Sequence, residues 1–101
     1  NLLKDFVTLQ KVDEIVNHCY HKYVIRLENK EIRDTLKKRL NAGVHYPNPI
    51  SENPMYNNLI NRVDECLNTQ QVCDTILTLP IHPYLTDEEV NKTCNIIMAT
   101  V

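Results

Sequence analysis

The clearest alternation of hydrophobic and polar positions lies between His18 and Leu27. One set of alternating positions is mostly apolar and consists of Cys19, His21, Tyr23, Ile25 and Leu27. A period of two residues is that of a half-buried strand. The pattern therefore predicts a strand over residues 18–27, with His21 as a hydrogen-bonded histidine on the core side.

A helix is predicted directly after this strand. Asn29 is a suitable N-cap, and an apolar stripe at every fourth position follows, formed by Ile32, Leu36 and Leu40. Gly43, the only glycine, is expected to turn the chain after the helix because glycine accepts positive φ. The short β-prone run Val44–Tyr46 comes next, so residues 18–46 predict a β-α-β unit.

Helical periodicity returns after the prolines of this region. Asn53 and Pro54 are typical of an N-cap and a first helical position. One helical face is then apolar, with Tyr56, Leu59, Ile60, Val63 and Leu67. A short helix over residues 69–74 and a strand over residues 75–79, ended by Pro80, are predicted to follow.

The last segment has the most complete helix signals. Thr86 and Glu89 match a capping box, and Leu85 and Val90 match a hydrophobic staple. The apolar stripe of this helix comprises Val90, Cys94, Ile97, Met98 and Val101. The predicted elements together indicate an α+β fold, in which helices cover a small antiparallel or mixed sheet.

Composition and charge narrow the class of protein. A chain of 101 residues makes one domain at most, and 43% hydrophobic with 24% charged residues is ordinary for a globular protein. The formal net charge of −2 argues against a nucleic-acid partner, although Tyr20, Lys22 and Arg26 could form a small basic aromatic surface. No apolar run approaches the ~20 residues of a membrane span, so a cytoplasmic protein with no membrane partner is expected.

The four cysteines contain no C-x-x-C pair, and most fall on apolar faces. This favours a reduced protein with thiols in its core over a secreted domain with two disulfides. Zinc is a further alternative, because three possible ligands are close together and three follow later: His18, Cys19, His21, Cys66, Cys73 and His82. Structural zinc sites usually take their ligands in tight pairs, so no metal site is assigned.

Two polar-aromatic pairs among the prolines are the candidate ligand-binding groups. They are His45–Tyr46 and His82-Pro83-Tyr84. Each could donate hydrogen bonds to a ligand, and each could equally be a tyrosine packed on proline with its hydroxyl in water. A single glycine excludes a phosphate-binding glycine loop, and no catalytic motif appears.

Three segments in order, HCYHKYVIR (18–26), GVHYPNP (43–49) and LPIHPYLTDEEV (79–90), resemble successive motifs of one family. They are similar to the C-terminal domain of the DegT/DnrJ/StrS family of sugar-nucleotide aminotransferases, from about His18 to the end of the chain. The resemblance implies the aspartate-aminotransferase fold, with pyridoxal phosphate as cofactor and transfer of an amino group, usually from glutamate, to a nucleotide-linked keto sugar.

The resemblance also implies how this chain takes part. The Schiff-base lysine and the aspartate that pairs with the pyridine nitrogen belong to the large domain, and their motifs are absent from this chain. Residues 1–17 would then connect to a large domain, and residues 18–101 would be the small domain, which is expected to be inactive and without cofactor when alone. His45 and Tyr46 would approach the substrate in the cleft, near a homodimer partner, with no catalytic residue in this chain.

Two departures from the family pattern concern specific positions. Ser51 stands where a histidine of the family's proline loop often contacts substrate, and Arg39 stands where a glycine usually ends the preceding helix. Ser51 and His21 are therefore secondary candidates for substrate binding. The alternative function, from a different class, is a non-catalytic α+β module that binds a small ligand or a protein.

Residues 1–17 carry little periodicity apart from the β-prone run Phe6–Leu9. If a large domain normally covers them, their apolar side chains should form an exposed patch, made of Leu2, Leu3, Phe6, Val7 and Leu9.

Overall fold

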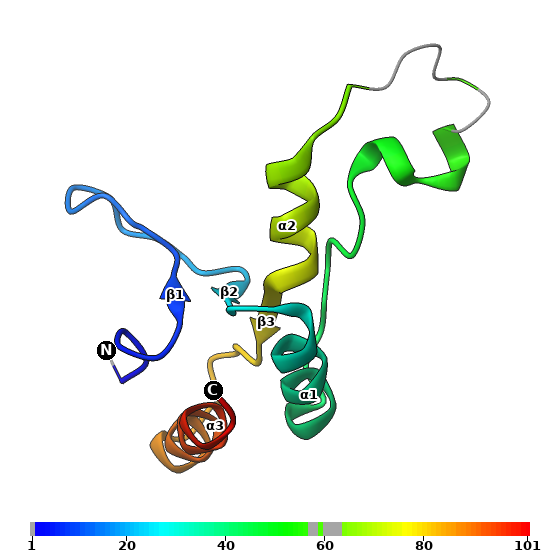
Figure 1. The fold of residues 1–101 in the computed structure, drawn as a ribbon. Helices are drawn as coiled ribbons and strands as arrows, with labels where there is room; N and C mark the ends of the chain where they lie inside the picture. Colours follow the sequence, from blue (N-terminus) through cyan, green and yellow to red (C-terminus); the bar gives the residue numbers. More distant parts are fainter. Residues whose placement is uncertain (1, 57–58, 60–63) are drawn as a thin grey trace.

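The structure is a computed structural model that describes residues 2–56, 59 and 64–101. Within these residues the chain forms a three-stranded sheet and three α-helices, which confirms the predicted α+β class (Figure 1). The strands are β1 (Thr8–Leu9), β2 (Tyr23–Arg26) and β3 (Ile76–Leu79). The helices are α1 (Lys30–Leu40), α2 (Leu67–Thr75) and α3 (Asp87–Thr100). The 3-10 turns η1 (Ile50–Glu52) and η2 (Pro54–Tyr56) lie between α1 and α2.

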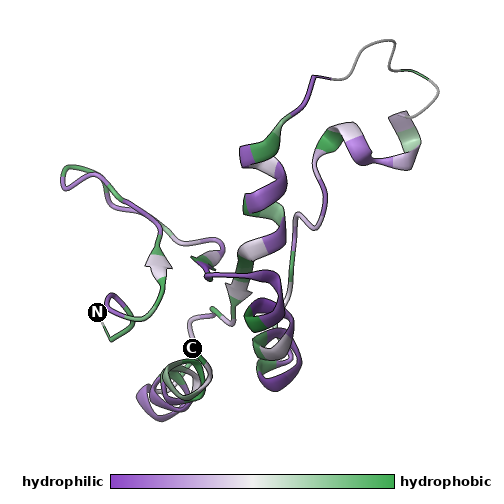
Figure 2. Ribbon diagram, viewed as in Figure 1, coloured by the Kyte–Doolittle hydropathy of each residue, from purple (hydrophilic) through white to green (hydrophobic). Residues whose placement is uncertain are grey.

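The sheet has the order β1-β2-β3, and both pairings are antiparallel. Ile25 pairs with Leu77, and the neighbouring Val24 pairs with Thr78, so these two pairs lie on opposite faces. The centre of the core consists of fully buried side chains from the sheet, α1 and α3: Ile25, Leu36, Leu77 and Ile97. Hydrophobic and hydrophilic residues alternate along α1 and α3 in Figure 2, as expected of helices that bury one side against a sheet.

β2 is shorter than the predicted strand over residues 18–27. Tyr20 has a φ of 47°, in the left-handed region that interrupts an extended strand, and its N–H donates to His18 Nδ1 at 2.8 Å. This local turn leaves Cys19 and His21 exposed. The prediction of a core histidine at position 21 is therefore wrong.

α1 begins as predicted, because the Asn29 side chain accepts a hydrogen bond from the Ile32 N–H at 2.9 Å. The prediction for its end is wrong. Asn41, with a φ of 48°, takes the left-handed position, and Gly43 has no positive φ. Gly43 forms a single antiparallel bridge to Thr78 rather than starting a strand, so the predicted β-α-β unit is also wrong.

The predicted helix after Pro54 lies largely in residues 57–58 and 60–63, outside the described part of the chain. Its first residues form the 3-10 turn η2, and its apolar positions Leu59 and Leu67 are exposed. The predictions for the next segments are confirmed, since α2 is followed directly by β3.

The N-terminal segment belongs to the same core. Leu3 and Val7 are buried, and Leu9 is half-buried beside the core cluster. Of the patch expected there, Leu2 and Phe6 are exposed. The patch is therefore smaller than predicted, because β1 pairs with β2 and brings this segment against the sheet.

The capping box of α3 is confirmed. The Thr86 side chain accepts from the Glu89 N–H at 3.2 Å, and the Glu89 carboxylate accepts from the Thr86 N–H at 2.9 Å. Along the predicted stripe, Cys94 and Ile97 are buried and Met98 is half-buried, whereas Val90 and Val101 at its ends are exposed. The stripe thus packs into the core at its centre alone.

Thr86→Ala is expected to lower the free energy of unfolding by about 1 kcal/mol, because the helix loses a side-chain acceptor for its free N–H groups. Urea unfolding followed by circular dichroism measures this loss. Thr93→Ala, which removes an exposed hydroxyl bonded within the same helix to the Glu89 carbonyl, is the control and should change little. Equal losses in the two variants would contradict a specific effect of the cap.

The same capping box gives a pH signature. Hydrogen bonds from the Thr86 N–H and hydroxyl hold the pKa of Glu89 below its ordinary value of 4.5. A carboxyl whose pKa is lower in the folded state stabilises the fold above the unfolded pKa, and this stabilisation is lost as the pH falls through the folded pKa. Glu89→Gln should therefore weaken the loss of stability below pH 4.5.

Candidate functional site

The candidate site begins where the chain leaves α1 and meets β3. The Gly43 carbonyl accepts from the Thr78 N–H at 2.9 Å, which fixes the following residues beside the strand. His45 Nδ1 then lies 2.8 Å from Thr78 Oγ1. Thr78 is on the sheet face opposite the core residue Leu77, so His45 is attached to that opposite face.

Gly43 lies close to the His45 ring, so a side chain at position 43 would meet it. A Cβ on Gly43 would lie 3.2 Å from His45 Cε1, closer than ordinary van der Waals contact. A larger residue at position 43 would require the imidazole to shift by a few tenths of an ångström. Gly43 therefore serves the close approach of the ring, rather than the positive φ that the sequence suggested.

The hydrogen bond to Thr78 determines what His45 can offer a ligand. It engages Nδ1, and either partner can donate, depending on the imidazole tautomer. A ligand bond from His45 would therefore use Nε2. Tyr46 follows with 63% of its surface exposed, so its hydroxyl can also reach a ligand in solvent.

The secondary candidates lie elsewhere. His21 is exposed on the segment before β2. Ser51 is in η1 and lines a shallow hollow of about 340 Å³ with residues at the start of α2, including Leu67 and Gln70. His45 and Tyr46 are thus neighbours in the chain and both are exposed beside β3, whereas His21 and Ser51 belong to other parts of the surface.

His82 and Tyr84 are joined by a hydrogen bond between a side chain and the backbone. His82 Nδ1 accepts from the Tyr84 N–H at 3.2 Å, and the two rings are 6.5 Å apart. Tyr84 is one of the most exposed apolar side chains described. These contacts form a local turn before α3.

A row of three rings was not predicted. The His18 and Tyr20 rings are 4.4 Å apart, and the Tyr20 and Tyr23 rings are 5.2 Å apart. Burial raises the pKa of Tyr23, and the neighbouring Tyr20 and Cys94 raise it further. The sequence suggests no such row, because strand alternation would place Tyr20 and Tyr23 on opposite faces.

The ring row ends at an apolar groove of about 360 Å³, here called the α3 groove. It is lined chiefly by Leu2, Tyr23, Leu79, Ile81, Val90 and Cys94. Burial raises the pKa of the Cys94 thiol, which keeps it protonated at neutral pH. The sequence predicted Val90 on the apolar stripe of α3, but no signal in the sequence indicated that it would line a groove with residues of β2 and β3.

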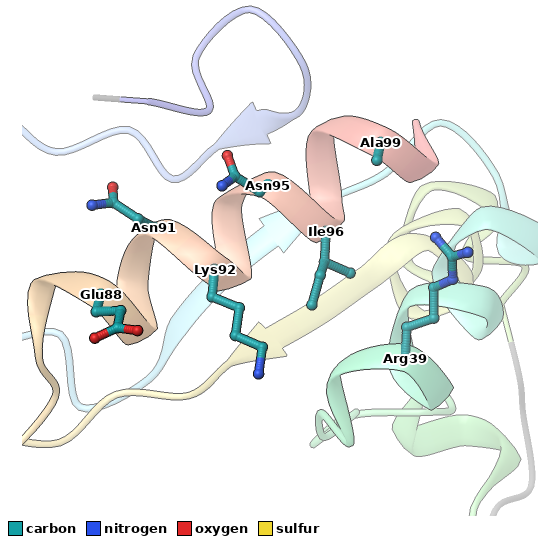
Figure 3. Close-up of a pocket in the computed structure, with 7 residues that line it drawn as sticks. All are labelled: Arg39, Glu88, Asn91, Lys92, Asn95, Ile96 and Ala99. Atoms are coloured by element: carbon teal, nitrogen blue, oxygen red, sulfur yellow. The ribbon is translucent and has the colours of Figure 1, made fainter.

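The other side of α3 is polar. Figure 3 shows Glu88, Asn91, Lys92 and Asn95 along it, and Ile96 facing Arg39 of α1 across an open hollow of about 940 Å³. Arg39 donates to the Thr100 hydroxyl at 2.9 Å. α3 therefore carries a polar side and an apolar groove on different parts of its surface.

The cysteines were considered for disulfides and zinc. All four are free thiols, with Cys19 and Cys66 exposed and Cys73 and Cys94 buried. Among the residues that the structure describes, no group of three or more His, Cys, Asp or Glu side chains could hold a metal ion. Within the same residues, no helix has the length and apolar character needed to cross a membrane.

Whether this chain could bind pyridoxal phosphate as a Schiff base depends on the surroundings of its lysines. The seven lysines all lie in described residues; six are exposed and Lys22 is half-buried. A Schiff-base lysine needs an enclosed site where other groups hold the phosphate and the pyridine nitrogen. Instead, Lys30 pairs with Asp74 at 3.4 Å on the surface, and Lys92 lies on the open side of α3 (Figure 3). The described residues do not fit this cofactor by themselves.

Comparison with known proteins gives a consistent result. The family model of the DegT/DnrJ/EryC1/StrS aminotransferase family matches residues 1–98. The erythromycin biosynthesis sensory transduction protein EryC1 of Saccharopolyspora erythraea is 33% identical over 93 residues, covering 85% of this chain and 25% of that protein. A crystal structure of a DegT DnrJ EryC1 StrS aminotransferase from Brucella abortus matches with a TM-score of 0.81 and 25% identity, covering 97% of this chain and 27% of that one.

The chain thus spans about a quarter of the length of these two relatives. The match to the family model covers nearly all of the chain. The chain belongs to the DegT/DnrJ/EryC1/StrS aminotransferase family.

Proposed function

We propose that this chain is the C-terminal small domain of an aminotransferase that uses pyridoxal phosphate and acts on a nucleotide-linked keto sugar. Residues 18–101 form the domain, and residues 1–17 connect it to a large domain while packing Leu3 and Val7 into its core. The amino donor is a compound such as glutamate, and the enzyme is a cytoplasmic homodimer. Family membership and the share of the relatives' length that is matched support this proposal.

Within that enzyme, His45 and Tyr46 hold the sugar-nucleotide in place. The supporting observation is the 2.8 Å contact between His45 Nδ1 and Thr78, which orients the imidazole while the residue remains exposed. An imidazole and a phenol can hydrogen-bond the hydroxyl and phosphate oxygens of such a substrate. Their proposed role is positioning, and the proton transfers belong to groups outside this chain.

The cofactor, when bound, supplies the electron sink for transamination. The exposed positions of the lysines support the proposal that its binding residues lie in the large domain. This chain alone should therefore be inactive. After incubation with pyridoxal phosphate and reduction with borohydride, no lysine should carry the cofactor specifically. A stoichiometric adduct mapped to one lysine would contradict the proposal.

His45→Ala in the full-length enzyme tests the substrate role. It is expected to raise the KM for the sugar substrate about tenfold, equivalent to about 1.4 kcal/mol, because a polar group of the substrate loses its partner. The half-reaction with glutamate should change little, since that donor does not need the nucleotide-binding contacts. Single-turnover kinetics of the two half-reactions separate these effects.

His82→Ala is the matched control, because His82 is also an exposed histidine in a proline-containing loop. It should change neither half-reaction. If His45 only ties its loop to β3, then His45→Ala should slow both half-reactions and lower the thermal midpoint together. Equal losses in the two half-reactions would refute the substrate role.

A further inference from the structure

Thr78 contacts the segment after α1 through both its backbone and its side chain. Its N–H donates to the Gly43 carbonyl at 2.9 Å, and its Oγ1 lies 2.8 Å from His45 Nδ1. Only 9% of the surface of Thr78 is exposed, whereas His45 is an exposed residue. A buried hydroxyl on β3 therefore meets the side chain of a histidine that solvent can reach.

The direction of this side-chain bond follows from the proton of the Thr78 hydroxyl. In a neutral imidazole one ring nitrogen donates and the other accepts, so Nδ1 either donates to Thr78 Oγ1 or accepts from it. If Nδ1 donated, the hydroxyl proton would need another acceptor. Within the described residues, the Thr78 hydroxyl has no hydrogen-bond partner besides His45. Because a buried donor without a partner costs free energy, the favoured arrangement has the hydroxyl donating to Nδ1.

This direction decides what the other ring nitrogen can do. When Nδ1 accepts, the proton of neutral His45 is on Nε2, which then donates a hydrogen bond and cannot accept one. A sugar hydroxyl both donates and accepts, so either tautomer would serve it. A phosphate oxygen only accepts, and it gains a charge-assisted bond from an N–H. A fixed Nε2–H therefore favours phosphate over the other polar groups of a nucleotide-linked sugar.

We propose that Thr78 is a positioning residue, whose hydroxyl fixes His45 as the Nε2–H tautomer for donation to a phosphate oxygen of the nucleotide-linked substrate. The inference rests on the proposed function, in which His45 contacts that substrate. Without the hydroxyl, the ring can rotate and carry its proton on either nitrogen. Only a fraction of the molecules then presents the donor correctly, and the apparent affinity falls in proportion to that fraction.

Nitrogen-15 NMR of the full-length enzyme, labelled at histidine, tests the tautomer without any substrate. A spectrum of His45→Ala assigns the signals of His45. At about pH 8.5, above the range in which unperturbed histidines titrate, the native enzyme and Thr78→Ser should carry the proton on Nε2. Thr78→Val should also show the Nδ1–H tautomer. A proton on Nδ1 in the native enzyme overturns the proposal, and this result needs no variant of Thr78 that folds.

Binding measurements on the same enzyme test the phosphate contact. Thr78→Val replaces the hydroxyl by a methyl group and keeps the N–H that bonds to Gly43. It should bind the nucleoside diphosphate of the sugar substrate about threefold or more weakly, whereas the nucleoside without phosphates should bind equally well to both enzymes. Thr78→Ser, which keeps the hydroxyl, should bind the diphosphate within about twofold of the native enzyme. Equal losses for the nucleoside and its diphosphate overturn the proposal.

A double variant shows whether Thr78 acts through His45. In the His45→Ala background, Thr78→Val should weaken binding of the diphosphate by less than about 1.5-fold. Equal effects of Thr78→Val in the two backgrounds would indicate a general change of the sheet and would overturn the proposal. A loss of binding in His45→Ala with none in Thr78→Val overturns the role of Thr78 alone. If neither variant loses affinity, the proposed substrate role of His45 fails together with it.

Discussion

Ile97→Ala is expected to lower the free energy of unfolding by roughly 2–5 kcal/mol. Ile97 is fully buried in α3 and belongs to the core cluster with Leu36 and Leu77, so truncation removes buried methyl groups and leaves a cavity that α1 and the sheet can fill only in part. Urea unfolding followed by far-ultraviolet circular dichroism measures the change.

Val101→Ala provides the control, because Val101 is on the same predicted stripe but 42% exposed. It should change the free energy of unfolding by less than about 0.5 kcal/mol. An Ile97→Ala variant with an unchanged urea midpoint would show that α3 does not pack through this side.

Arg33→Met is expected to lower the free energy of unfolding by about 2–3 kcal/mol. Arg33 is only 6% exposed, its Nη1 donates to the Cys73 carbonyl at 3.1 Å, and its Nε lies 2.7 Å from the Asp34 carboxylate. The last carbonyls of a helix have no partner within the helix, so the guanidinium completes the end of α2. Methionine fills a similar volume and donates no hydrogen bond.

Arg39→Met tests whether the effect is specific to the buried arginine. Arg39 is on the same helix but exposed, and it donates to the Thr100 hydroxyl. Arg39→Met should lower the free energy of unfolding by less than about 0.5 kcal/mol, as most surface substitutions do. Equal destabilisation by the two variants would mean that the bond to Cys73 contributes little to the stability of the fold.

The interactions that the sequence predicted are local. The caps at Asn29 and Thr86 join groups three residues apart, and the burial of Leu36 and Ile97 follows from the period of each helix. The family motifs are likewise continuous stretches of chain. For these reasons the α+β class and the family could be predicted without the structure.

The interactions that determine the candidate site connect distant positions. His45 meets Thr78 across 33 residues, and the Gly43 carbonyl accepts from the N–H of the same Thr78. The sequence predicted a proline-stiffened loop around His45 and Tyr46, but it did not reveal the close approach of the His45 ring to Gly43. Such contacts depend on how β3 is placed beside the end of α1.

Tertiary structure also corrected the local predictions. The turn at Tyr20 ended the strand that alternation had extended to His18, and Asn41 took the left-handed position expected of Gly43. Periodicity reports which residues could share a face, whereas pairing partners decide where a strand stops. The sequence by itself determined the positions of α1, α2 and α3, the caps at Asn29 and Thr86, and the family of this protein. The tertiary structure decided the extent of the sheet, the anchoring of His45 and the α3 groove, because these require contacts between segments far apart in the chain.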